Sequence, residues 1–215
     1  MAAGQSKRLK SKVPKPFLLL DRQKTMLDLC LEAFRRVQGL AYVVIVTRKP
    51  YMERAAQALG PFNLPGIVTE GGEQREDSVW QGLMVVPPWA KHVLVHDAAR
   101  PLVSPGVIQR VIEATRRRGA VIPVVPVKDT LKLIVNGKVD KTLDRSKIWA
   151  VQTPQGFETS ILKKAFLKIG KKASNLTDDA AVVEMAGMKV YTVEGDPHNF
   201  KVTTPEDLKR AKELV

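Results

Sequence analysis

The sequence feature that most constrains the fold is a charged segment, residues 96–101, directly after an apolar run. The run, Val-Leu-Val at 93–95, is typical of a buried parallel strand, and Ser104 and Pro105 beyond it predict a helix start. In open α/β sheets, ligands bind at the carboxyl ends of the strands. Asp97 and Arg100 are therefore candidates to hold a ribose hydroxyl, a metal ion or a phosphate. A turn capped by Asp97 and a solvated Arg100 would explain the same residues.

Apolar strands alternate with amphipathic helices along most of the chain. The predicted strands span residues 41–47, 67–68, 93–97, 120–127 and 189–194. The predicted helices span residues 25–37, 51–59, 77–86, 104–119, 157–169, 177–185 and 204–215. This alternation is typical of a parallel sheet, so we expect an α/β fold with a mostly parallel sheet and helices on both faces.

Residues 128–150 interrupt the alternation. Asn136 and Gly137 form a strong hairpin-turn signal between apolar runs at 131–135 and 139–143. A lone hairpin is only marginally stable in water. We therefore expect a two-stranded arm that projects from a single domain, residues 1–215, and packs on a second subunit.

The chain is strongly basic. Lysine and arginine outnumber aspartate and glutamate by 35 to 22, which gives a formal net charge of +13. This charge favours an anionic partner, whether nucleic acid, a membrane surface or a phosphorylated small molecule. The sequence contains no helix-turn-helix, zinc-finger or aromatic RNA-binding signature, and no apolar run near the roughly 20 residues of a membrane span. We therefore expect neither a nucleic-acid nor a membrane partner.

The single cysteine, Cys30, lies in an apolar helical pattern. One cysteine excludes an internal disulfide and fits a reducing compartment, and its position favours a core residue over a nucleophile. The N-terminal residues lack the apolar core of a signal peptide. We expect a cytoplasmic protein, or one of the plastid stroma, with its transit peptide absent, if the source is a plant.

Two small-residue segments are candidates for nucleotide binding. Residues 2–4 (Ala-Ala-Gly), followed by Arg8 and Lys15, combine backbone amides with two cations, which suits a triphosphate. A disordered basic tail would have the same composition. Residues 71–72 (Gly-Gly) allow close approach to a flat ligand such as a base, with Ser78 as a hydrogen-bond donor, although Asp77 and Ser78 could simply cap a helix.

In order and spacing, these motifs resemble the 2-C-methyl-D-erythritol 4-phosphate cytidylyltransferases of the non-mevalonate isoprenoid pathway. The resemblance covers essentially the whole chain. It rests on residues 2–4, Arg8, 14–15, 71–72, Arg75, 77–79, 95–101, 126–127, 129–130, Lys132, 144–145, 152–155, 177–180, Asn199, Lys201, Thr203 and 205–208. It implies a Rossmann-like nucleotidyltransferase sheet with a projecting β-arm.

The resemblance also implies a reaction and a set of roles. A cytidylyl group would pass from CTP to the acceptor phosphate with release of pyrophosphate. Mg²⁺, bound mainly through the CTP phosphates, would assist, and no separate metal site formed by protein side chains is expected. Arg8 and Lys15 would neutralise the CTP phosphates, and Arg145 and Lys201 would position the acceptor. In a homodimer, Arg145 would complete the site of the neighbouring subunit.

The remaining site residues implied by the resemblance fall into two groups. The positions that face cytidine or ribose are Ala2, Ala3, Gly4, Gly72, Glu73, Ser78, Asp97 and Ala98. The acceptor-side contacts are Asp97, Arg100, Thr130, Arg145 and Lys201. Positioning and charge stabilisation would supply most of the catalysis, which agrees with the absence of a Ser-His-Asp or Cys-His set.

Three features depart from the family pattern. The family's first strand, central in its sheet, would precede Ala2, so we expect the chain to begin upstream of Met1. Pro16 stands where glutamine is usual, and Ser6 where a second glycine is common. Three alternatives stay open: a cytidylyltransferase for another polyol phosphate such as ribitol 5-phosphate, a degenerate paralogue without activity, and a non-catalytic nucleic-acid-binding protein.

Overall fold

Two neighbouring sheets carry the fold. The structure is a computed structural model and describes residues 1–4, 11, 13–62, 65–170 and 176–215. The first sheet is the parallel pair of β1 and β2 (Val43–Thr47 and Gly66–Glu70). The second sheet has the order β3, β8, β4, β7, with β9 also on β4 (His92–Val95, Gln155–Glu158, Ala120–Pro126, Trp149–Val151 and Tyr191–Glu194).

The strand directions confirm the α/β class and refine it. Because β8 is antiparallel to both β3 and β4, and β9 is parallel to β4, the strands β3, β4 and β9 all run in the same direction. The sequence did not predict β7 and β8, which are antiparallel. β8 is short and leads directly into a helix that the sequence pattern had begun at residue 157 and that begins at Thr159.

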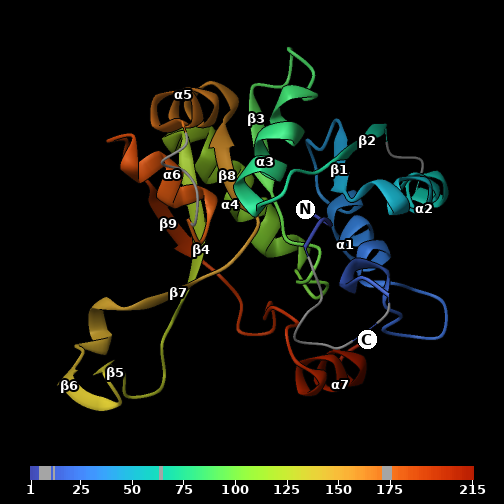
Figure 1. Cartoon of the computed structure of the whole chain (residues 1–215). Helices are drawn as coiled ribbons and strands as arrows, with labels where there is room; N and C mark the ends of the chain where they lie inside the picture. The colour runs from blue at the N-terminus through green and yellow to red at the C-terminus, as the bar shows by residue number, and fades with distance from the viewer. Residues whose placement is uncertain (5–10, 12, 63–64, 171–175) are drawn as a thin grey trace.

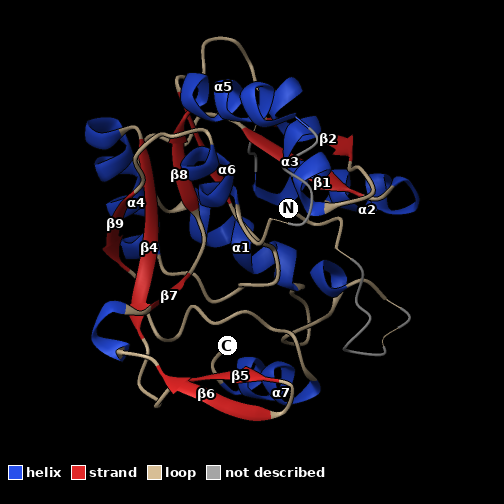
Figure 2. Cartoon of the chain, turned by 60° about the vertical axis from the view of Figure 1, so that its left-hand side comes forward, coloured by secondary structure: helices blue, strands red, loops and turns tan. Residues whose placement is uncertain are grey.

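The part of the chain that the structure describes contains seven α-helices (Figure 2). They are α1 to α7 in chain order: Met26–Arg35, Met52–Gln57, Arg75–Met84, Pro105–Arg118, Thr159–Ile169, Asp179–Met185 and Pro205–Glu213. In that part of the chain, α7 packs against the start of α1 and not on a sheet. Short 3-10 turns span Lys15–Phe17, Lys49–Tyr51, Gly60–Phe62 and Arg145–Lys147. No helix among the described residues is long and apolar enough to cross a membrane.

Several helix starts confirm the sequence signals. Thr25 and Thr204 cap α1 and α7 through reciprocal capping boxes with the residue three positions later. Ser104 caps α4, with Pro105 at its first position. α3 begins at Arg75, earlier than predicted, because Gln74 is its N-cap residue.

The predicted hairpin is present. β5 (Lys132–Val135) and β6 (Lys138–Thr142) pair in antiparallel fashion. Asn136 and Gly137 join them with φ angles of 48° and 76°, the left-handed pair that a tight hairpin turn requires. Figure 1 shows this arm projecting away from the two sheets.

Met1 and Ala2 connect the two sheets. The Ala2 amide donates to the Val46 carbonyl at the end of β1 (2.7 Å). On the other side, the Met1 amino group donates to the His96 carbonyl (2.6 Å), and the Ala98 amide donates to the Met1 carbonyl (3.0 Å). Within the described residues, β1 pairs only with β2 and β3 only with β8, so each has one edge without a partner strand. Met1 and Ala2 connect these two edges.

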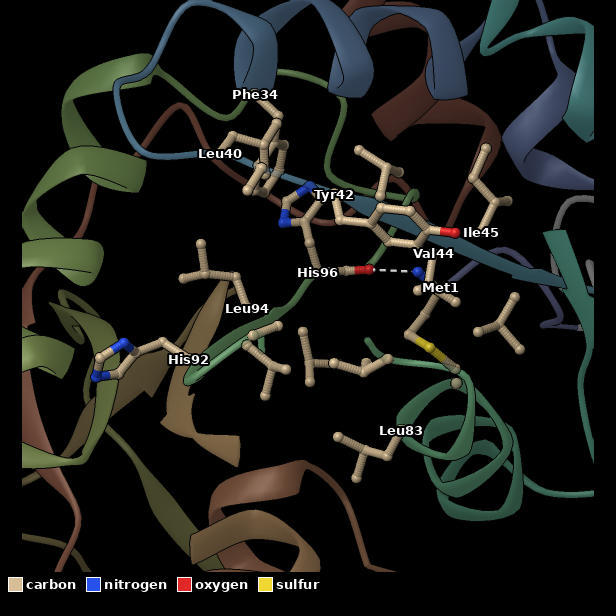
Figure 3. Close-up of a pocket in the computed structure, with 18 of the residues that line it drawn as sticks. Met1, Phe34, Leu40, Tyr42, Val44, Ile45, Leu83, His92, Leu94 and His96 are labelled. Atoms are coloured by element: carbon tan, nitrogen blue, oxygen red, sulfur yellow. Dashed lines mark hydrogen bonds between the residues drawn. The ribbon is translucent and has the colours of Figure 1, made fainter. Parts of the chain in front are cut away.

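A cavity of about 460 Å³ lies between β1 and β3. Figure 3 shows Met1 at this cavity, with the apolar side chains of Val44, Leu83 and Leu94 around it. Its walls come from both strands and from helices α1, α3 and α4. The cavity therefore occupies the place where a further strand between β1 and β3 would lie.

Candidate active site

A chain of hydrogen bonds holds the backbone directly after β3. Nε2 of His96 lies 3.2 Å from the Arg100 carbonyl, which can only accept, so Nε2 carries the proton. Nδ1 then accepts from the Thr153 hydroxyl (3.0 Å), whose oxygen accepts from the Asp97 amide (3.1 Å). Burial lowers the pKa of His96 to about 3, so the ring is neutral at pH 7. This chain orients Asp97 at the carboxyl end of the strand.

The Asp97 carboxylate lies between two cations. Nζ of Lys201 is 2.6 Å from Oδ2, and an Nη atom of Arg75 is 3.4 Å from Oδ1. Burial alone would raise the pKa of this carboxyl, but Arg75 and Lys201 hold it well below its usual range. Asp97 is therefore an oriented anion with a side chain only 12% exposed.

Arg75 is itself held by a second carboxylate. Its guanidinium makes a bidentate contact with Asp179, at 2.9 and 2.8 Å, and the Asp179 side chain is 1% exposed. Burial opposes the charge on Arg75, yet the two carboxylates raise its pKa above the usual range. Burial also raises the pKa of Asp179, and the Arg75 contact opposes that rise. The contact thus stabilises the charged forms of both Arg75 and Asp179.

The start of α6 is fixed to β8 by one buried side chain. Oε1 of Gln155 accepts from the amides of Asp179 and Ala180 (3.1 and 3.0 Å), and its Nε2 donates to Oδ2 of Asp178 (2.8 Å). Asp178 in turn caps α6. The position of Asp179 is therefore set by the sheet.

The glycine pair after β2 lies against the N-terminal segment. A Cβ on Gly71 would lie 2.8 Å from Cβ of Ala3 and 2.7 Å from Oγ of Ser78, so only glycine fits there. The Ser78 hydroxyl donates to the Gln74 carbonyl (2.9 Å), and Asp77 accepts from the Gln74 amide (3.1 Å). Both side chains thus make the contacts of a helix start, which was the alternative to ligand binding.

The other predicted nucleotide-side residues frame the same region. Gly4, Gly72 and Glu73 are exposed, whereas Ala2 and Ala98 are buried and are joined to each other through Met1. Ala2 and Ala98 thus lie beside the strand end that carries Asp97, and the close approach of Gly71 to Ala3 places the glycine pair next to the same N-terminal segment.

The segment at 199–202 docks on the same strand end. The Val202 amide donates to the Ala99 carbonyl (2.8 Å), and Nζ of Lys15 donates to the Val202 carbonyl (3.3 Å). Lys15 thus lies beside the segment that carries Lys201. Arg100 donates to the carbonyls of Asn199 (2.7 Å) and Val151 (3.1 Å) and ties this segment to β7.

Two predicted residues, Arg145 and Thr130, lie elsewhere. Arg145 is on the 3-10 turn after the arm, where it donates to the Lys128 carbonyl (2.5 Å), and Thr130 is exposed just before the arm. A cleft of about 540 Å³ is lined by Pro126, Arg145 and Trp149, among others. Arg8 lies outside the described residues. Within one chain, the structure does not join Arg145 and Thr130 to the Asp97 group.

Sequence reasoning included Arg75 and Asp179 in matched segments but assigned neither a role. Their contact spans 104 residues of sequence, and each is simply a charged residue in the first turn of a helix. No local pattern signals such a pair. The buried Gln155 and Thr153 also lie in a matched segment, residues 152–155, and were assigned no role for the same reason.

Comparisons with known proteins agree with this geometry. The protein-family model described as IspD: 2-C-methyl-D-erythritol 4-phosphate cytidylyltransferase matches residues 1–215. The enzymes of that name from Bacillus pumilus and Bacillus anthracis are 38% and 40% identical over 217 residues, covering 100% of this chain and 94% and 95% of theirs.

Solved structures give the same result. The 2-C-methyl-D-erythritol 4-phosphate cytidylyltransferase of Thermus thermophilus superposes with a TM-score of 0.81 at 37% identity, covering 99% of this chain and 95% of that one. The enzyme of that name from Francisella tularensis superposes with a TM-score of 0.84 at 32% identity, covering 100% and 96%. The expected fold class is thereby confirmed.

Proposed function

This chain belongs to the 2-C-methyl-D-erythritol 4-phosphate cytidylyltransferase family, and from that we propose how it works. It transfers a cytidylyl group from CTP to 2-C-methyl-D-erythritol 4-phosphate in the isoprenoid pathway. An oxygen of the acceptor phosphate attacks the α-phosphorus of CTP. As that P–O bond forms, the bond to pyrophosphate breaks, and pyrophosphate leaves.

Both reactants are anions, so the chain's task is to bring them together and to neutralise their repulsion. No covalent intermediate is needed, and oriented cations supply most of the stabilisation. The net charge of +13 suits two polyanionic substrates.

The observation that carries the proposal is the group of charges at the carboxyl end of β3. Nζ of Lys201 forms an ion pair with Oδ2 of Asp97 at 2.6 Å. Nζ of Lys15 donates to the carbonyl of Val202, the next residue of the same segment. Lys201 is 42% exposed on its side chain, so it can move from Asp97 to the acceptor phosphate. Lys15 neutralises the CTP phosphates, together with Arg8, and Asp97 faces the ribose.

The arm supports a homodimer. Ile134, Val135, Val139 and Trp149 are each about half exposed or more, at 54%, 51%, 61% and 49%. An exposed apolar group of this kind marks a protein–protein contact. Packed on a second copy, the arm carries Arg145 into the neighbouring site, where it holds the acceptor phosphate.

Mg²⁺ fits this site as a companion of the nucleotide. Among the described residues, no group of three or more His, Cys, Asp or Glu side chains is placed to hold a metal ion. Asp97 offers a carboxylate at the strand end, but both of its oxygens already face cations. The CTP phosphates would therefore supply most of the ligands, and the ion would add positive charge at the reacting phosphates. We place the reaction in the cytoplasm, in keeping with the single buried thiol.

The test is pyrophosphate release by the purified chain with CTP, Mg²⁺ and 2-C-methyl-D-erythritol 4-phosphate. Ribitol 5-phosphate is assayed in parallel. Lys201→Met should abolish most turnover, whereas Lys209→Met, which removes an exposed lysine on α7, should not. Turnover with ribitol 5-phosphate and none with 2-C-methyl-D-erythritol 4-phosphate would identify ribitol 5-phosphate as the acceptor. No turnover with either acceptor would overturn the proposal.

A further inference from the structure

Four side chains of alternating charge form a row at the candidate active site, and we call Lys201, Asp97, Arg75 and Asp179 the charge row. The contacts along it are 2.6 Å, 3.4 Å and the bidentate pair at 2.9 and 2.8 Å. The row has no net charge. Its members come from four separate parts of the chain.

The two cations of the row differ in how firmly they are held. Lys201 is the more exposed, at 42% against 26% for Arg75, and its flexible stem ends in a point charge. Arg75 is fixed by two parallel hydrogen bonds to Asp179, which is buried and lies in the first turn of α6. One cation at Asp97 is therefore movable, and the other is anchored.

We propose that Arg75, anchored by Asp179, is a positioning residue that keeps Asp97 in place when Lys201 moves to the acceptor phosphate. This inference rests on the proposed function, in which Lys201 binds that phosphate. Asp97 and the phosphate compete for the same ammonium group. Arg75 favours the transfer because it leaves Asp97 with a cationic partner after Lys201 has moved.

Without Arg75 the exchange becomes costly. Asp97 is only 12% exposed, and a largely buried carboxylate without a partner carries a large desolvation penalty. Lys201 would then stay on Asp97, and the acceptor phosphate would bind more weakly. CTP binding would be less affected, because Lys201 would still hold Asp97 where it faces the ribose.

The experiment needs a variant that folds. Arg75→Met alone would leave Asp179 as an unpaired buried charge, which is strongly destabilising. The double variant Arg75→Met/Asp179→Leu removes both charges and replaces the pair by apolar side chains, a change that is often neutral for stability. Arg36→Met is the matched control, because it breaks an ion pair with Glu32 on the surface of α1.

In the double variant, KM for the acceptor should rise about tenfold, as expected for loss of an oriented charged contact. KM for CTP and the thermal midpoint should stay close to those of the parent chain. Lys201→Met should raise the acceptor KM in the parent background and add little in the double variant, because both changes act on one exchange. Arg36→Met should change neither KM.

Two results would overturn the inference: an acceptor KM unchanged in the double variant, or equal losses in both KM values with a lower thermal midpoint, which would indicate a structural role. A parent chain without turnover would instead count against the proposed function. The same variants would then be compared by calorimetric titration with 2-C-methyl-D-erythritol 4-phosphate, where a tenfold weaker Kd supports the inference and an equal Kd refutes it.

Discussion

Mild acid should destabilise this protein through His96. The ring is buried and neutral, with its pKa lowered from 6.5 to about 3. Between these two values the unfolded chain binds a proton at this histidine and the native chain does not. Stability is therefore fully present above pH 6.5 and falls as the pH drops toward 3.

The size of the effect follows from the two pKa values. Each pH unit within the window costs about 1.4 kcal/mol of unfolding free energy. Between pH 7 and pH 5 the loss from His96 is about 2 kcal/mol, since the unfolded chain begins to protonate only near pH 6.5. Across the whole window the loss is roughly 5 kcal/mol, a large fraction of the stability of a typical domain. The depressed pKa of Asp97 adds a loss of the same sign at still lower pH.

Urea unfolding at pH 7, 6 and 5 measures this loss directly. His96→Gln keeps an acceptor and a donor but cannot titrate, so its unfolding free energy should fall by about 2 kcal/mol less than that of the parent between pH 7 and 5. His92→Gln, at the exposed start of the same strand, retains the parental slope because His96 is intact. Equal slopes for the parent and His96→Gln would refute the assignment of a neutral, buried ring.

Other predictions test the site, the arm and the cavity. Lys15→Met should lower turnover by about 10²- to 10³-fold with little change in the thermal midpoint; a rate near that of the parent would remove Lys15 from the mechanism. Arg145→Ala should raise KM for the acceptor more than KM for CTP, and the reverse order would contradict its assigned role. Deletion of residues 131–143 should give monomers in sedimentation, where a persisting dimer would disprove assembly through the arm. Four β-branched apolar residues added before Met1 should fill the cavity of about 460 Å³ and raise the thermal midpoint by roughly 5–10 °C. A glycine-serine extension of equal length should not.

Local signals predicted much of the fold because they act over a few residues. The capping residues Thr25, Ser104 and Thr204 each satisfy the first amides of a helix, so sequence alone located the starts of α1, α4 and α7. The Asn136 and Gly137 turn is equally local. β7 and β8 escaped prediction because they are three and four residues long and are defined by their partner strands.

The site was predictable to the extent that its residues follow a strand end or a glycine pair. Asp97 and Gly72 were assigned as candidates in this way. The role of Arg75 and Asp179 depends on a contact between two helices, which no local pattern predicts. That contact depends in turn on Gln155, a buried residue of β8, and sequence reasoning did not predict this strand. Resemblance placed both residues in matched segments, but only the three-dimensional arrangement shows that Arg75 contacts both Asp179 and Asp97.

The location of the cavity links stability to the site. Ala2 and Ala98 belong to the apolar cluster of β1, while Val95 belongs to the cluster of the second sheet. The backbone on both sides of this boundary carries groups of the candidate active site, and hydrogen bonds from Met1 and Ala2 cross it. Because packing is lacking beneath that crossing, relative movement of the two sheets costs less there than in a filled core. A nucleotide that contacts the loop after β2 and the end of β3 would bridge the same boundary, so its binding should stabilise the contact between the two sheets.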